Sequence, residues 1–384
     1  MKDESGMYVL VTILSMGIGL FFIWAYHTLF KGEDRHLFAP QASHQLPTPR
    51  LGGSAVLLAI FIMILISGRK IDVELLLCTI PVFVFGLIED LGRSTSPRIR
   101  LAVAAIATLL GIAVFGIWID RVDVPVVDFA FVWAPVGIVF TVFAVTGLVH
   151  AINLIDGVNG LASGKVILSS GALALIAAKF NEPMIAHLAT LVMFATIGLF
   201  ILNYPLGRIF MGDAGAYSLG FILGWMIIFL MHRQPEISAW AMLAVIFWPV
   251  MDTVFAIGRR RFSNGRADKP DRLHFHQLIM RFWEIMSGGK LSKKIANPLA
   301  TATILPLAAL PVVGGVVFVD QPLASFLVVA ASCLVFWLTY SLAIFVVRRR
   351  RLRHLLGRLT SPIYGLFLRP DQHSEPTEPA TPAE

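Results

Sequence analysis

The sequence predicts an all-α, polytopic integral membrane protein, and three observations support this fold class. Hydrophobic residues make up 57% of the 384-residue chain, and charged residues make up only 14%. The mean hydropathy of +0.78 lies far above the range of water-soluble globular proteins. The apolar residues are also gathered into runs of about 20, which is the length that an α-helix needs to cross a bilayer.

We expect about eleven transmembrane helices in one catalytic domain that spans residues 1–347. The first run is too long for a signal peptide, so we expect it to be retained as a helix. Residues 348–384 are expected to form a basic and then disordered tail. The expected helices are 7–30, 51–68, 74–91, 100–119, 130–152, 165–180, 184–203, 214–231, 237–257, 299–318 and 323–347.

The distribution of lysine and arginine predicts the orientation in the membrane. An odd number of helices places the two termini on opposite sides. Basic residues concentrate in cytoplasmic segments, so the N-terminus is expected outside and the C-terminus in the cytoplasm. This distribution explains the pI of about 9.6 without a nucleic-acid partner. The expected cytoplasmic segments are 31–50, 92–100, 153–165, 203–213, 258–298 and 348–384, which hold 25 of the 31 basic residues.

Two adjacent carboxylates, Glu89 and Asp90, end one of the apolar runs. Neighbouring residues on a helix diverge by about 100°, so the two side chains need not share a ligand. One can face a site while the other pairs with Arg93, Arg98 or Arg100. A solvated helix end with ordinary salt bridges is the alternative.

Asn153, Asp156 and Asn159 recur at intervals of three residues. On a helical turn this spacing places them on one face, and Gly157 and Gly160 permit tight turns and close approach of a ligand. Amide and carboxylate oxygens suit a hard cation or a sugar phosphate. The alternative is an ordinary Asn/Gly turn between helices.

Asp213 lies where a further apolar run begins. It is either an N-cap or a ligand for Mg²⁺ at a helix start whose amides point toward phosphate. The other acidic clusters are expected on the same membrane face, so we favour the metal. Several carboxylates at one face indicate a divalent cation and, with it, phosphate chemistry.

The segment 258–298 carries Arg272, His274 and His276. No cysteine or third histidine stands at a convincing spacing for zinc. Cationic and histidine donors instead suit a diphosphate. Asp252 precedes this segment, and the sequence leaves open whether it pairs with an arginine or touches substrate.

Arg50 stands between two prolines, Pro47 and Pro49, and two glycines, Gly52 and Gly53. The prolines stiffen the segment, and the glycines favour close packing where the next helix begins. Arg50 either binds a lipid phosphate or extends to the membrane interface, and the sequence favours neither reading.

Five of these segments, in this order, resemble the polyprenyl-phosphate N-acetylhexosamine-1-phosphate transferases, which form glycosyltransferase family 4. The expected eleven helices resemble the WecA-type members more than the MraY-type members. The resemblance covers about residues 7–350. The matching stretches are 47–53, 89–90, 153–161, 210–215 and 271–277.

The resemblance implies a reaction at the cytoplasmic face of a bacterial inner membrane. A polyprenyl phosphate such as undecaprenyl phosphate attacks the β-phosphate of a UDP-N-acetylhexosamine, by default UDP-GlcNAc, and UMP is released. This transfer is the first membrane step of cell-surface glycan synthesis. The resemblance also implies a Mg²⁺ cofactor, with Mn²⁺ as a substitute, and a homodimer among membrane lipids.

The resemblance assigns roles residue by residue. Glu89 stands where the family usually has aspartate, and Gln277 stands where a further histidine is common. The expected catalytic residues are Asp90, Asp156 and Glu89, the expected metal ligands are Asp213 and Asn153, and the expected substrate-binding residues are Asn159, His274, His276, Arg272 and Arg50.

A secondary transporter that uses its carboxylates as cation or proton sites is the alternative function. Transporters place such groups near the middle of the membrane and often contain inverted repeats. Here the acidic residues lie at expected inner helix ends, and no repeat is evident.

Overall fold

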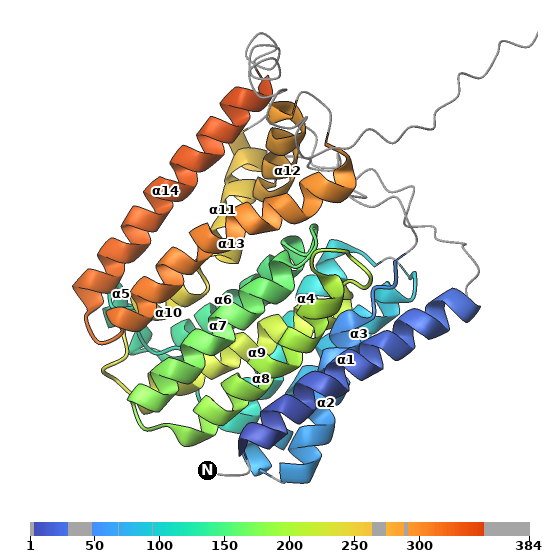
Figure 1. Cartoon of the computed structure of the whole chain (residues 1–384). Coiled ribbons are helices and arrows are strands. Elements are labelled where there is room, and N and C mark those ends of the chain that lie inside the picture. The colour runs from blue at the N-terminus through green and yellow to red at the C-terminus, as the bar shows by residue number, and fades with distance from the viewer. Residues whose placement is uncertain are drawn as a thin grey trace, which may run out of the picture.

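The computed structural model describes residues 4–29, 48–67, 69–93, 95–262, 274–287 and 291–348, and all regular structure in these ranges is α-helical (Figure 1). The helices are α1 (Glu4–Leu29), α2 (Gly52–Ser67), α3 (Lys70–Asp90), α4 (Pro97–Phe115), α5 (Pro125–Phe131), α6 (Ala134–Leu154), α7 (Leu161–Lys179), α8 (Pro183–Asn203), α9 (Gly212–Arg233), α10 (Ala239–Val245), α11 (Phe247–Phe262), α12 (Phe275–Met286), α13 (Lys293–Val317) and α14 (Pro322–Arg348).

The predicted fold class, an all-α integral membrane protein, is confirmed. Nine helices in the described ranges are long and apolar enough to cross a membrane, and α10 with α11 makes a tenth if the bent pair is one span. The expected run 51–68 forms only a shorter apolar helix, Gly52–Ile66. The count of eleven and the outside position of the N-terminus stay predictions.

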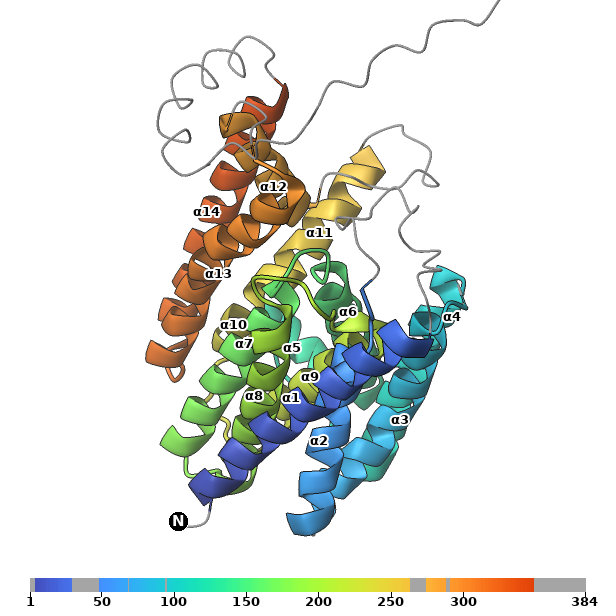
Figure 2. The same ribbon diagram turned by 45° about the vertical axis from the view of Figure 1, so that its right-hand side comes forward.

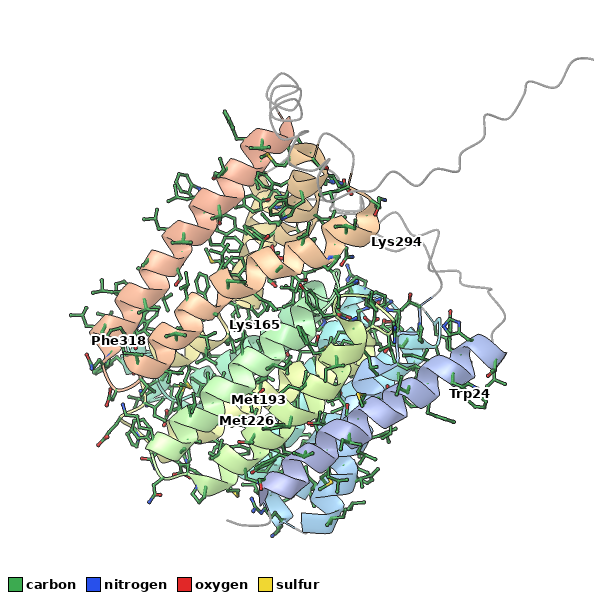
Figure 3. The ribbon with its side chains drawn as sticks, in the orientation of Figure 1. Trp24, Lys165, Met193, Met226, Lys294 and Phe318 are labelled. Atoms are coloured by element: carbon green, nitrogen blue, oxygen red, sulfur yellow. The ribbon has the colours of Figure 1, made fainter. Side chains whose placement is uncertain are left out.

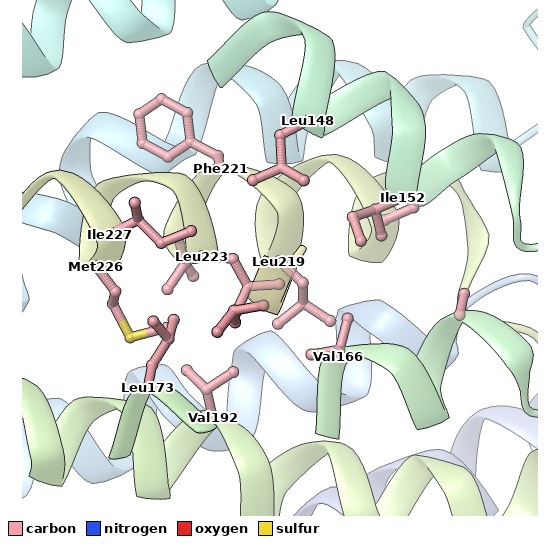
Figure 4. Packing of buried hydrophobic residues seen from close by; sticks show 14 of the residues in the cluster. Leu148, Ile152, Val166, Leu173, Val192, Leu219, Phe221, Leu223, Met226 and Ile227 are labelled. Atoms are coloured by element: carbon pink, nitrogen blue, oxygen red, sulfur yellow. The ribbon is translucent and has the colours of Figure 1, made fainter. Parts of the chain in front are cut away.

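Helix α9 forms the centre of the bundle. All its residues from Gly212 to Met231 are buried, and it packs against α2, α3, α6, α7 and α8. Figure 4 shows Leu219, Leu223 and Met226 of α9 between Leu148 of α6 and Leu173 of α7. A helix that is enclosed on every side is apolar all round, which is why α9 shows no polar face. The start of α9 is therefore held from several directions.

Close contacts between small residues fix the start of α9 against α2 and α3. A Cβ atom on Gly53 would lie 2.1 Å from the Cα atom of Gly215, and one on Gly86 would lie 2.5 Å from the Cα atom of Ala214. Small residues let helix backbones approach closely within a membrane. The glycines of the 47–53 segment therefore serve packing, as the sequence indicated for Gly53.

A sharp bend separates α10 from α11, although the sequence predicted one helix over 237–257. The two helices meet at 84°. A break leaves the last carbonyls of α10 without helical partners. Lys165 of α7, which is labelled in Figure 3, donates to the carbonyl of Val245 at 2.6 Å, and the Ser169 hydroxyl donates to the same oxygen at 2.9 Å. These donors satisfy the end of α10 at the bend.

Helices α12, α13 and α14 pack on one another and form one side of the molecule, next to α7 (Figures 1 and 2). Within the segment 258–298, which the sequence predicted as a loop, the structure contains the end of α11, the whole of α12 and the start of α13. Residues 263–273 and 288–290 of this segment, and residues 349–384 of the predicted tail, lie outside the described ranges.

The Gly53→Ala variant tests the close packing at the start of α9. The added methyl group meets backbone atoms of Gly215 and Met211, so α2 and α9 must separate. We expect a loss of about 1–3 kcal/mol of stability, seen as a lower thermal unfolding midpoint in detergent. Gly147→Ala is the matched control, because a Cβ atom there meets nothing within 4 Å. Equal midpoints for the two variants would contradict the packing argument.

Candidate active site

The first turn of α9 is capped by carboxylates from two other segments. The amides of Asp213 and Ala214 donate to the two oxygens of Asp90, at 2.8 and 2.9 Å, and the amide of Gly212 donates to Asp156 at 3.1 Å. The first amides of a helix have no partner within the helix, and the helix dipole favours negative charge there. Three carboxylates, including that of Asp213 itself, therefore meet at one buried helix end.

Gly212 makes this meeting sterically feasible. Its φ angle is +75°, in the left-handed region that favours glycine. A Cβ atom at this position would lie 1.9 Å from the carbonyl oxygen of Arg50 and 2.7 Å from a carboxylate oxygen of Asp90. Any other residue would push apart the segments that form the site.

The segment that carries Arg50 is bound to the entrance of α9 by backbone hydrogen bonds. The amide of Phe210 donates to the carbonyl of Pro49 at 2.9 Å. The amides of Gly52 and Gly53 donate to the carbonyls of Phe210 and Met211, both at 2.8 Å. This pairing fixes the position of the Arg50 side chain relative to the start of α9.

Arg50 and Asn153 both contact Asp213. The guanidinium of Arg50 donates to the Oδ1 atom of Asp213 at 3.1 Å, and the Asn153 amide donates to the same oxygen at 2.7 Å. Arg50 also lies 3.8 Å from Asp90. Arg50 thus balances the acidic cluster, a role that neither sequence reading foresaw. The N-cap of α9 is Met211, so the capping interpretation of Asp213 is wrong.

The donor set fits a hard divalent cation at Asp213 and Asp156. One oxygen of each carboxylate accepts no hydrogen bond within the described ranges. Burial raises the pKa of Asp156 to about 7, although Arg50 and the amide of Gly212 oppose this change. A bound cation favours the ionised carboxylate, and such oxygens are the ligands that Mg²⁺ prefers.

Asp90 offers no carboxylate oxygen that is free of hydrogen bonds. Both of its oxygens are bound to amides of α9. No group of three histidine, cysteine, aspartate or glutamate side chains in the described part of the chain is arranged to hold a metal. Asp90 therefore holds the start of α9 in place, whereas Asp213 and Asp156 each keep one oxygen that accepts no hydrogen bond in the described ranges.

Glu89 and Asp90 diverge as the helical geometry predicted. Asp90 faces the acidic cluster, whereas the carboxylate of Glu89 lies 2.8 Å from the Nε atom of Arg100 and accepts a hydrogen bond from Tyr217 at 2.9 Å. Thr95 also donates to Glu89. The expectation that one carboxylate takes a basic partner is confirmed. Glu89 thus ties α3 to α4 and α9 beside the site.

The predicted single face of Asn153, Asp156 and Asn159 is wrong for Asn159. Its side chain donates to the carbonyl of Pro205 at 2.8 Å, and its backbone amide donates to Asn297 of α13 at 2.7 Å. Asn153 and Asp156 contact α9, so Asn159 alone points away. Helix α6 ends at Leu154, so helical spacing does not extend through the turn to Asn159.

The two histidines lie parallel beside Asp252. Their ring centroids are 5.8 Å apart, and their Nδ1 atoms lie 3.8 and 4.0 Å from one oxygen of Asp252. The other oxygen of Asp252 accepts from the amide of Phe275 at 3.2 Å. Asp252 therefore positions the start of α12, an interaction that neither sequence alternative named. Arg272 lies outside the described residues.

His276 brings α12 against the turn that carries Asp156. A Cβ atom on Gly157 would lie 2.4 Å from the Nε2 atom of His276, so this glycine is needed for the approach of the ring. Burial lowers the pKa of His276 to about 4, although Asp252 opposes this shift. His276 is therefore a neutral imidazole at pH 7 and not the cationic donor that a diphosphate site would favour.

Several residues that shape the site escaped the sequence analysis. Tyr217 stands one helical turn after Asp213, so helical spacing offered a signal for it. Asn297 and Thr301, which bind the backbone of Asn159, lie 138 and 142 residues further along the chain, so spacing offered no signal for them.

Comparison with known proteins identifies a family and several relatives of this chain. Residues 73–231 match the family described as glycosyl transferase family 4. A probable undecaprenyl-phosphate N-acetylglucosaminyl 1-phosphate transferase of Bacillus subtilis is 28% identical over 247 residues, which are 62% of this chain and 67% of the relative.

Two further relatives carry the name undecaprenyl-phosphate alpha-N-acetylglucosaminyl 1-phosphate transferase. The protein of Yersinia pestis is 30% identical over 62% of this chain and 67% of its own length. The protein of Escherichia coli K12 is 31% identical over 62% of this chain and 66% of its own length. The resemblance read from the five segments is confirmed, and the chain belongs to glycosyl transferase family 4.

Proposed function

We propose that this protein transfers a sugar-1-phosphate, GlcNAc-1-phosphate by analogy with its relatives, from a UDP-sugar to undecaprenyl phosphate. One observation carries the proposal: carboxylates from three separate segments meet, beside Arg50, at the buried start of α9. We place this end of the bundle at the cytoplasmic face of a bacterial inner membrane, because the basic residues concentrate in the segments on that side.

The proposed reaction is a displacement at phosphorus. An oxygen of the lipid phosphate bonds to the β-phosphorus of the UDP-sugar, the bond from that phosphorus to the bridging oxygen breaks, and UMP leaves with the electron pair. Phosphoryl transfer of this kind depends on charge neutralisation and in-line positioning more than on covalent help from the protein. The lipid phosphate is already an anion at neutral pH, so the step needs no strong base.

The side chains at the start of α9 have different roles in binding the phosphates and the cation. Arg50 is one-third exposed, so its guanidinium can meet an incoming phosphate while it remains near Asp213. Mg²⁺ or Mn²⁺, when bound at Asp213 and Asp156 beside Asn153, supplies the positive charge that a diphosphate requires. Asp90 keeps both oxygens on α9 amides, which favours direct attack by the lipid over transfer through Asp90.

The remaining expected site residues act around this centre. We assign Glu89 a positioning role, because Tyr217, Thr95 and Arg100 occupy its carboxylate. Asn159 fixes the shape of the turn. His276 packs against Gly157 and positions the turn that carries Asp156.

The geometry favours a transferase over a secondary transporter. The carboxylates lie in the first turn of α9, at the last residue of α3 and in the turn after α6. All three positions are at helix ends, whereas transporters place ion sites near the middle of the membrane.

Asp213→Asn tests the proposed activity. The variant keeps the size of the side chain but removes its charge, so we expect release of UMP from UDP-GlcNAc to fall by at least about 100-fold. The assay uses purified protein, undecaprenyl phosphate and Mg²⁺ in detergent. Asp320→Asn is the control, because Asp320 pairs with Lys179 at the opposite end of the bundle. Wild-type activity in Asp213→Asn would refute the proposal.

The buried neutral state of His276 predicts a pH dependence of stability. A histidine in the unfolded chain titrates near 6.5 and His276 in the folded protein near 4, so the unfolded chain binds more protons between these values. Stability should therefore fall by up to about 3 kcal/mol as the pH drops from about 6.5 to about 4. His276→Gln should lose less stability over this window.

The readout is the thermal unfolding midpoint at pH 7 and at pH 5. His232→Gln, at an exposed position on the last turn of α9, is the control and should keep the wild-type dependence on pH. An unchanged dependence in His276→Gln would show that this ring is not the buried neutral group described above.

A further inference from the structure

Lys165 carries a buried amine that the proposed mechanism does not use. Its side chain is only 1% exposed, and within the described ranges its amine forms no ion pair with a carboxylate. Burying such a group is costly, and an ionisable side chain inside a membrane helix indicates a functional role. Its two acceptors are the Ser169 hydroxyl at 3.0 Å and the carbonyl oxygen of Val245 at 2.6 Å. Neither acceptor belongs to the proposed active site.

The carbonyl of Val245 requires an outside donor because Pro249 stands four residues later. In an α-helix each carbonyl accepts from the amide four residues further along the chain, and proline has no amide hydrogen. Helices α10 and α11 meet at 84° directly after Val245. The amine of Lys165 and the hydroxyl of Ser169 therefore take the place of the amide that Pro249 lacks.

These hydrogen bonds connect the bend to the turn that carries Asp156. Lys165 and Ser169 lie on α7, which begins at Leu161, directly after that turn. The amine donates both to Val245 and to the Ser169 hydroxyl, and the hydroxyl donates to Val245 as well, so the three groups form one closed network. Because all three residues are buried, the network leaves little freedom in where α10 ends relative to α7.

Helix α11 carries the direction of the bend to the start of α12. The carboxylate of Asp252 accepts from the amide of Phe275 at 3.2 Å. The ring of Trp248 lies edge to face with the ring of Phe275, with centroids 5.0 Å apart. His276, the next residue, packs against Gly157 of the turn between α6 and α7. A change in the angle between α10 and α11 would therefore move His276 relative to this turn.

We propose that Lys165 is a positioning residue of the active site. By donating to Val245 it fixes the bend, and the bend holds α11 and α12 so that His276 stays against the turn that carries Asp156. The amine acts through these helices and not by contact with a substrate. Its effect on the reaction rests on the proposed function, whereas the position of His276 is measured without reference to any activity.

Lys165→Met removes the donor but keeps an unbranched side chain of similar length. Ser169 still donates to Val245, and replacing a buried amine by an apolar group is often neutral for stability, so the variant should keep a thermal unfolding midpoint close to that of the wild type. The readout is the rate at which diethyl pyrocarbonate modifies His276 in the full-length protein in detergent, followed by mass spectrometry. His276 is 3% exposed and reacts only through local opening, so we expect its rate in the variant to rise at least about tenfold.

Release of UMP from UDP-GlcNAc should fall at least about tenfold in the same variant, because a small displacement of positioned groups slows a reaction strongly. Ser169→Ala is a second variant that removes the longer of the two bonds to Val245 and keeps the amine, so both effects should be smaller. Lys179→Met is the matched control. Lys179 is the other lysine of α7, lies at the opposite end of the bundle and pairs with Asp320 at 2.9 Å. This control should keep both wild-type rates.

His187, a buried histidine near the start of α8, is the internal reference for the labelling, and its rate should not change. Any of the following results would overturn the proposal: an unchanged His276 rate in Lys165→Met, an equal rise at His187, unfolding of the variant, an equal or larger effect of Ser169→Ala, or undiminished UMP release. Absence of UMP release from the wild type would instead refute the proposed function, and the histidine rates would still decide whether Lys165 positions α12.

Discussion

The fold and the site both depend on how the buried start of α9 satisfies its amides. The first amides of a helix have no helical acceptor, and a buried amide that stays unpaired costs several kcal/mol. Asp90 and Asp156 supply the missing acceptors. Because these two acceptors are carboxylates, the same contacts that hold the central helix also place negative charge beside Asp213. Arg50 offsets part of that charge, Asn153 donates a hydrogen bond to Asp213, and we propose that a divalent cation balances the rest.

The surrounding elements hold this arrangement from several sides. The segment around Arg50 is hydrogen-bonded to the entrance of α9, and Asn297 of α13 binds the turn that follows Asp156. The bend between α10 and α11 is held by Lys165, which follows that turn on α7. Helix α11 then carries Asp252, which positions the histidines against Gly157. Residues far apart in sequence thus contact the turn between α6 and α7 from several sides.

The sequence predicted what local rules determine. Runs of apolar residues located the membrane helices, and the 100° rotation between helical neighbours separated Glu89 from Asp90. It did not predict the bend within 237–257, although Pro249 stands in the first turn of α11, because the donor that stabilises the bend lies on another helix. It also misjudged Asn159, whose direction is set by Pro205 and α13. Such features arise from tertiary contacts that spacing along the chain does not encode.

The most direct test of the account is the binding of Mn²⁺ to the purified protein, followed by electron paramagnetic resonance. We predict one ion per chain, displaced by Mg²⁺, with binding lost in Asp156→Asn and in Asp213→Asn but kept in Asp320→Asn. Removal of Asp156 or Asp213 without any loss of bound Mn²⁺ would contradict the claim that these carboxylates form one cation site at the start of α9.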